Sequence, residues 1–110
     1  MVDLITDNLA AITALCEKYG VRKLEVFGSA TDPSRFSPET SDVDFVIEFA
    51  DREHGYAKRF FRFTEEIEAL LGRSVDYVFG NQPIRNPYFR DAVDESRVII
   101  YESRDRQAAA

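Results

Sequence analysis

Residues 42–49, DVDFVIEF, constrain the fold most strongly, because polar and apolar side chains largely alternate along them. This period of two predicts a β-strand with one buried face, on which Val43 and Phe45 lie. Asp42 and Asp44 then project from the other face, about 7 Å apart along the backbone. Two carboxylates on one face repel each other unless a cation lies between them. The pattern therefore favours a divalent cation that prefers oxygen ligands, such as Mg²⁺ or Mn²⁺.

A second strand is expected upstream, over Val21 to Phe27, and it ends at the pair Gly28-Ser29. Residues 28–41 are rich in serine, threonine and proline, which predicts a long loop. Loops of this length in a small domain are often functional. Glycine allows the backbone to approach a phosphate closely, and amides and a serine hydroxyl can bind phosphate oxygens.

The rest of the chain alternates between helical and strand patterns. The expected elements are a helix from about Thr6 to Tyr19, strands over 21–27 and 42–49, a helix over 56–71, a strand over 75–79, a short helix from Asn86 and a strand over 98–101. This order predicts an α/β (α+β) domain, a mixed β-sheet with helices packed mainly on one face. We expect one domain over residues 1–102 and a disordered tail over 103–110.

Charge and cysteine content narrow the class of protein. The net charge of −6 argues against direct nucleic-acid binding, which usually needs a basic surface. The single cysteine, Cys16, falls on the apolar stripe of the first helix and is expected to be a buried hydrophobe. The chain starts without a signal-peptide pattern and has no membrane-spanning apolar run, so a cytoplasmic location without membrane contact is expected.

A third carboxylate, Asp76, lies in the strand over 75–79, on the face opposite its apolar neighbours. If that strand pairs with the strand over 42–49, Asp76 converges with Asp42 and Asp44. Three such acids can hold two Mg²⁺ ions about 3.5–4 Å apart, an arrangement typical of in-line phosphoryl transfer. The alternative for each acid is a solvated side chain on an exposed strand face.

These motifs, in this order, resemble the minimal nucleotidyltransferases (MNT) of the DNA polymerase beta-like nucleotidyltransferase superfamily. The similar segments are Gly28-Ser29, Ser41-Asp42-Val43-Asp44, Val75-Asp76-Tyr77-Val78, the helix start Asn86-Pro87-Tyr88-Phe89 and the strand Val98-Ile99-Ile100-Tyr101. The resemblance covers most of the chain and implies the nucleotidyltransferase fold.

The resemblance also implies an enzyme that transfers AMP from ATP, its substrate, to a hydroxyl with two Mg²⁺ ions as cofactor. By this resemblance Asp42 and Asp44 bind both metals. Asp76 binds the metal near the attacking hydroxyl and helps to deprotonate it. Gly28 and Ser29 hold the β- and γ-phosphates.

Many small stand-alone members of this family are antitoxins that adenylylate a tyrosine of a HEPN-type toxin. The resemblance therefore implies a HEPN-type partner, and it leaves a homo-oligomer open. Two alternatives remain: a non-catalytic nucleotide-binding module that neutralises its partner by binding, and a transferase acting on a small molecule.

The loop after Gly28-Ser29 departs from the family pattern. Family members often have Ala-Arg-Gly at this point, whereas this chain reads Ala30-Thr31-Asp32-Pro33. Arg35 is the only cation in the loop, and we take it as a candidate ligand of the triphosphate. The only histidine, His54, precedes the long helix among charged residues and is expected to be a surface residue.

Overall fold

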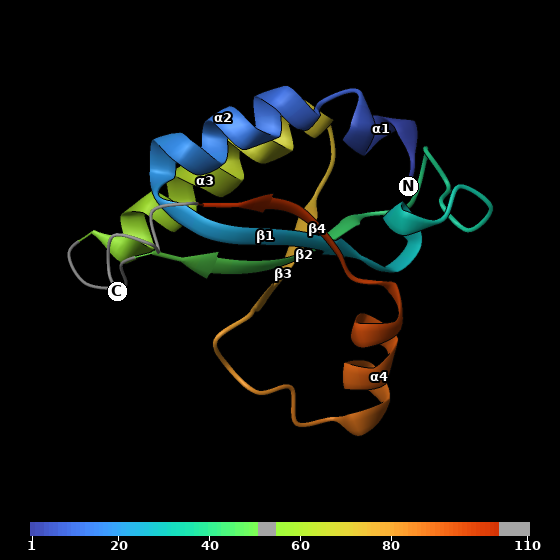
Figure 1. Cartoon of the computed structure of the whole chain (residues 1–110). Coiled ribbons are helices and arrows are strands. Elements are labelled where there is room, and N and C mark those ends of the chain that lie inside the picture. Colours follow the sequence, from blue (N-terminus) through green and yellow to red (C-terminus); the bar gives the residue numbers. More distant parts are fainter. Residues whose placement is uncertain (51–54, 104–110) are drawn as a thin grey trace.

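The computed structural model describes residues 1–50 and 55–103. Its elements, in chain order, are α1 (Asp3–Thr6), α2 (Leu9–Tyr19), β1 (Val21–Phe27), the 3₁₀ helix η1 (Gly28–Thr31), β2 (Val43–Phe49), α3 (Tyr56–Leu71), β3 (Val75–Phe79), α4 (Pro87–Ser96) and β4 (Val98–Glu102). They form the mixed α/β architecture expected from the sequence (Figure 1).

The four strands form one sheet in the order β3-β2-β1-β4. β1 pairs antiparallel with both β2 and β4, whereas β2 and β3 run parallel and are joined through α3. The expected pairing of the strands that carry Asp44 and Asp76 is therefore confirmed. The parallel register places Asp44 opposite Asp76, and the antiparallel register places Phe27 opposite Asp44.

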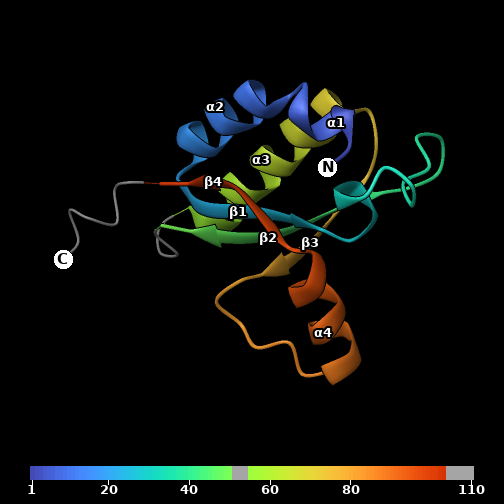
Figure 2. The same ribbon diagram turned by 45° about the vertical axis from the view of Figure 1, so that its right-hand side comes forward.

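Helices α2 and α3 cover one face of the sheet (Figures 1 and 2). Leu24 and Phe45 from the sheet pack there against Phe63 and Ile67 of α3, and all four are fully buried. This main core follows from the sequence, because the period-two stripe of each strand faces the helical stripe of α3. Gly72 ends α3 in the left-handed conformation, with φ of 69°.

The shorter helix α4 lies on the opposite face of the sheet (Figures 1 and 2). Its Val93 is fully buried and forms a smaller core with Phe27 and Val46. Asn86 caps α4 by accepting hydrogen bonds from the backbone N–H groups of the next two non-proline residues. The face that carries Asp44 is thus partly covered by α4 and not by the two longer helices.

Several details differ from the sequence-based expectation. β2 begins at Val43, so Asp42 precedes the strand. Ser103, assigned to the tail, is buried, and its N–H donates to the carbonyl of Arg22 at 2.7 Å. The expected tail over 104–110 lies outside the described residues. Within the described residues, no helix is long and apolar enough to cross a membrane.

Candidate functional site

The side chains of Asp44 and Asp76 project from the same face of two adjacent parallel strands, β2 and β3. The pairs on either side of them, Val43 with Val75 and Phe45 with Tyr77, point into the main core. Side chains alternate between the faces of a strand, so both carboxylates point away from α2 and α3. Neighbouring strands lie about 4.8 Å apart, which brings the two acidic side chains within reach of a shared ligand.

Asp44 is half-buried, whereas Asp42 and Asp76 are exposed. Burial, followed by repulsion from Asp76 and then from Asp42, raises the pKa of Asp44 to about 6. In residues 1–50 and 55–103, no lysine or arginine forms an ion pair with any of the three carboxylates. The site therefore carries negative charge that its own side chains do not neutralise.

The three carboxylates do not form a closed metal cage. Among the described residues, no group of three His, Cys, Asp or Glu side chains stands in a position to hold a metal ion. Like charges repel each other, and the Asp42 and Asp76 side chains are exposed to solvent. The backbone thus brings the acids close together near the start of β2 and β3, but their carboxylates do not converge on one point.

Gly28 lies directly against Asp44. Its φ is +76°, and a Cβ at this position would lie 2.9 Å from Asp44 Oδ2, so only glycine fits without movement. The backbone N–H of Gly28 donates to Ser96 Oγ at 2.9 Å, and its carbonyl accepts from Thr31 Oγ1 at 2.7 Å. The Ser29 hydroxyl has no hydrogen-bond partner in the part of the chain that the structure describes.

Arg35 is exposed and lines a hollow of about 580 Å³ together with Gly28 and Ser96. The hollow lies between η1 with its following loop and α4. The three carboxylates are not among its walls. The structure thus places Arg35 near the glycine turn, in a hollow that Asp42, Asp44 and Asp76 do not line.

Two residues at this site were not predicted from the sequence. Ser96 binds the N–H of Gly28, and Arg73 Nη1 donates to the carbonyl of Ser41 at 3.1 Å, directly before Asp42. The Arg73 guanidinium also lies 5.1 Å from the ring centre of Phe36. A serine at a helix end and an arginine in a turn are too common to signal such contacts, which only the tertiary fold creates.

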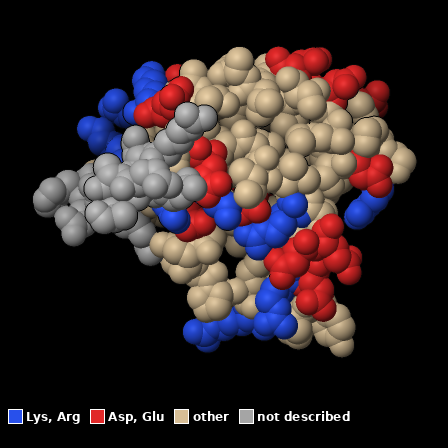
Figure 3. Space-filling model, viewed as in Figure 1, with Lys and Arg blue, Asp and Glu red and all other residues tan. Residues whose placement is uncertain are grey.

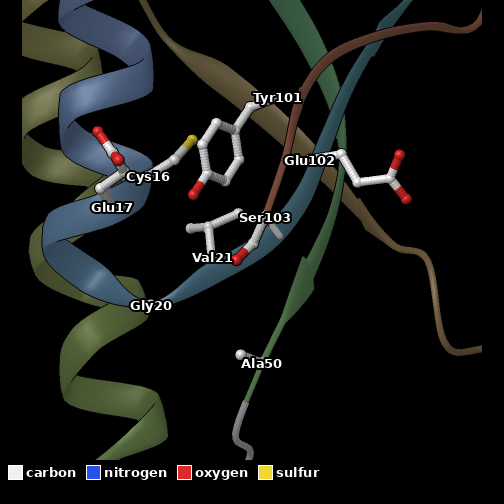
Figure 4. Close-up of a pocket in the computed structure, with 8 residues that line it drawn as sticks. All are labelled: Cys16, Glu17, Gly20, Val21, Ala50, Tyr101, Glu102 and Ser103. Carbon is white, nitrogen blue, oxygen red and sulfur yellow. The ribbon is translucent and has the colours of Figure 1, made fainter. Parts of the chain in front are cut away.

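Another hollow, of about 330 Å³, lies at the other end of the sheet, where β1 begins and β2 ends (Figure 4). Cys16 lines it beside Tyr101 and is fully buried, as expected for a core residue. Burial, with a smaller effect from Glu17, raises the pKa of the Cys16 thiol to about 12, so the thiol stays protonated and unreactive.

Charge on the molecular surface is mixed. On the face shown in Figure 3, acidic and basic side chains are interspersed and no continuous basic field is visible. His54, expected from the sequence to be a surface residue, lies outside the described residues.

Comparison with known proteins shows the family to which the chain is related. The nucleotidyltransferase domain family matches residues 10–100. The chain is 28% identical over 86 residues to the "putative protein adenylyltransferase MJ1379" of Methanocaldococcus jannaschii, a match covering 78% of this chain and 83% of the relative. It is 41% identical over 64 residues to the protein adenylyltransferase MntA of Thermococcus cleftensis, covering 58% and 61%.

Solved structures extend the likeness to the fold. A "putative minimal nucleotidyltransferase" superimposes with a TM-score of 0.65 at 28% identity, covering 88% of this chain and 95% of that one. The complex of a tri-AMPylated HEPN toxin with an MNT antitoxin from Shewanella oneidensis gives 0.59 at 14% identity, covering 94% and 77%. At that identity the second likeness concerns the fold alone. Because the family match spans most of the chain and the first structure shares both fold and sequence, the chain belongs to the nucleotidyltransferase domain family, among its minimal members.

Proposed function

We propose that the chain is a magnesium-dependent nucleotidyltransferase that transfers AMP from ATP to a hydroxyl of a partner protein. The observation that carries this proposal is the register of Asp44 with Asp76, next to a glycine turn that contacts Asp44. The names of two relatives, both protein adenylyltransferases, support a protein as the acceptor.

The carboxylates of Asp42, Asp44 and Asp76 are suitable ligands for magnesium. They offer hard oxygen ligands, and no lysine or arginine among the described residues pairs with them. Burial, and then repulsion from Asp76 and Asp42, raises the pKa of Asp44. Two Mg²⁺ ions, when bound, would offset the charge of these carboxylates and stabilise the attacking and leaving oxygens of an in-line displacement. In this proposal Asp42 and Asp44 hold both ions, and Asp76 holds the one nearer the acceptor.

In the proposed reaction the acceptor oxygen bonds to the α-phosphorus of ATP, the bond to the bridging oxygen breaks, and pyrophosphate leaves. Asp76 assists removal of the proton from the acceptor hydroxyl. Gly28 lies directly against Asp44, and the Ser29 hydroxyl, which has no partner among the described residues, would donate to the oxygens of a phosphate beside the turn. Arg35, exposed on the loop that follows the turn, would bind the triphosphate.

We further propose that the acceptor is a tyrosine of a HEPN-type toxin, which makes this chain the antitoxin. The motif resemblance supports this, as does the fold shared with an MNT antitoxin solved with a tri-AMPylated HEPN toxin. A cytoplasmic location and an ATP preference belong to the same proposal.

Co-expression of the chain with a HEPN-type partner, followed by intact-mass measurement of the partner, tests this function. The wild type is expected to add one or more AMP units. Asp42→Asn is expected to add none, because it removes a metal ligand from an exposed position without disturbing the core. Asp7→Asn makes the same chemical change at an exposed site on α1's C-terminal end and is expected to behave as wild type. Equal labelling by Asp42→Asn would refute the metal assignment.

One observation favours a second candidate, a module that neutralises its partner by binding alone. The Gly28 N–H, which a phosphate would otherwise use, is already bound to Ser96. The same experiment separates the two candidates, because tight binding of the partner without any mass increase identifies the module.

A further inference from the structure

The last residue of α4 contacts the first residue of the glycine turn. Ser96 Oγ accepts a hydrogen bond from the Gly28 N–H at 2.9 Å and donates one to the carbonyl of Ala92 at 3.0 Å. A single hydroxyl therefore connects α4 to the backbone of a turn 68 residues earlier in the chain.

The residue after Ser96 fixes this end of α4 to the sheet. Arg97 Nε and Nη2 donate to the two carboxylate oxygens of Glu25 at 2.9 and 2.7 Å. Glu25 lies on β1 and is only 4% exposed, so this two-bond ion pair is well anchored. Ser96 and Arg97 thus hold the end of α4 at two points of the same segment, Glu25 and Gly28.

The orientation of the Gly28 peptide matters for the neighbouring acid. Gly28 has a positive φ and approaches Asp44 so closely that a Cβ would lie 2.9 Å from Oδ2. A rotation of this peptide changes both the space beside Asp44 and the direction of the turn that leads into Ser29. The hydrogen bond that the Gly28 N–H donates to Ser96 Oγ is the contact that fixes the direction of this N–H.

We propose that Ser96 is a positioning residue of the nucleotide site, which holds the glycine turn in the geometry that accepts the triphosphate of ATP. This inference rests on the proposed function and adds a residue, contributed by α4, to the site. It predicts that the hydroxyl matters for nucleotide binding, although Ser96 itself does not contact the reacting atoms.

Three variants test this role. Ser96→Ala removes the hydroxyl and Ser96→Thr keeps it. Thr6→Ala is a matched control, because Thr6 also donates to a carbonyl of its own helix but lies on α1. Calorimetry gives the dissociation constant of ATP in the presence of Mg²⁺, and amide hydrogen exchange by NMR reports on the Gly28 N–H.

We expect faster exchange of the Gly28 amide in Ser96→Ala and ATP binding weaker by roughly three- to tenfold, the effect of losing one hydrogen bond. Ser96→Thr is expected to restore both, and Thr6→Ala to bind ATP as the wild type does. A purely structural role for Ser96 would lower stability without changing ATP affinity.

Two results would overturn the proposal: unchanged ATP binding in Ser96→Ala despite faster Gly28 exchange, or tighter binding, which would mean that Ser96 competes with the phosphate. A wild type that binds ATP but leaves its partner unmodified would refute AMP transfer and leave the comparison of the Ser96 variants valid. A wild type that binds no ATP would overturn both proposals.

Discussion

Replacing Gly28 by alanine tests how closely the glycine turn approaches Asp44. A methyl group at this position would lie 2.9 Å from Oδ2 of Asp44, so the carboxylate has to move about 0.5 Å to reach ordinary van der Waals contact. The backbone also has φ of +76°, which strains an alanine. Gly72→Ala is the matched control, because Gly72 has φ of +69° and nothing within 4 Å of its Cβ position.

Both substitutions carry the left-handed strain, and we expect each to lower the free energy of unfolding by about 1–2 kcal/mol. The displaced atom in Gly28→Ala is the end of a short side chain, so the added loss of stability is small. The functional loss is not small, because a shift of that size displaces a proposed metal ligand. Misplacement of about 1 Å at such sites costs about a hundredfold in rate.

Urea unfolding gives the stability of both variants, and intact-mass measurement over time gives the rate of AMP transfer to the partner. We expect Gly72→Ala to transfer at nearly the wild-type rate and Gly28→Ala to be slower by at least about tenfold. Equal transfer rates in the two variants, at equal stability, would refute the inference that Gly28 sets the position of Asp44.

Two further predictions concern charge. The pKa of Asp44 is raised to about 6 from an ordinary value of 3.8, because the folded state favours the protonated carboxyl. This contribution to the free energy of unfolding is fully present below pH 3.8 and is lost as the pH rises through 6. Asp76→Asn removes part of the repulsion on Asp44. Urea unfolding of the metal-free protein should therefore show the variant to be more stable than the wild type at pH 8, and this difference in stability should shrink toward pH 4. A difference in stability that does not change with pH would contradict this reasoning. Arg97→Met leaves Glu25 buried, and among the described residues Lys23, at 3.7 Å, is then its remaining ion-pair partner. We expect urea unfolding to show a loss of about 2–3 kcal/mol, somewhat below the loss for a fully buried pair because the Arg97 side chain is 32% exposed. A loss under about 0.5 kcal/mol would show that the pair is not structurally important.

Local patterns were sufficient to predict the four strands, the helices α2, α3 and α4 and the strand positions of Asp44 and Asp76, whereas α1 and η1 were not predicted. The period-two alternation of 42–49 and the apolar strand over 75–79 predicted which face Asp44 and Asp76 occupy, and the register of β2 with β3 agrees. Gly72 ends α3 as expected, because only glycine adopts the left-handed conformation there without strain. These features depend on residues close together in sequence.

Side-chain hydrogen bonds and ion pairs between distant residues could not be predicted. The burial of Glu25 depends on Arg97, and the direction of the Gly28 N–H depends on Ser96, which is 68 positions away. An acid in a strand normally indicates a solvated face, and only the docking of α4 makes Glu25 a buried anchor. The roles of the predicted site residues in binding metal and nucleotide all stay predictions: Asp42, Asp44, Asp76, Gly28, Ser29 and Arg35.

In the proposed reaction the acids on β2 and β3 bind the cation required for AMP transfer. Mn²⁺ added with a non-hydrolysable ATP analogue tests it directly, because the ion broadens the NMR signals of nearby amides. We predict the strongest broadening at Asp44 and Asp76 in the wild type and its loss in Asp44→Asn. Sharp signals at these two residues, with broadening elsewhere in the chain, would contradict the account.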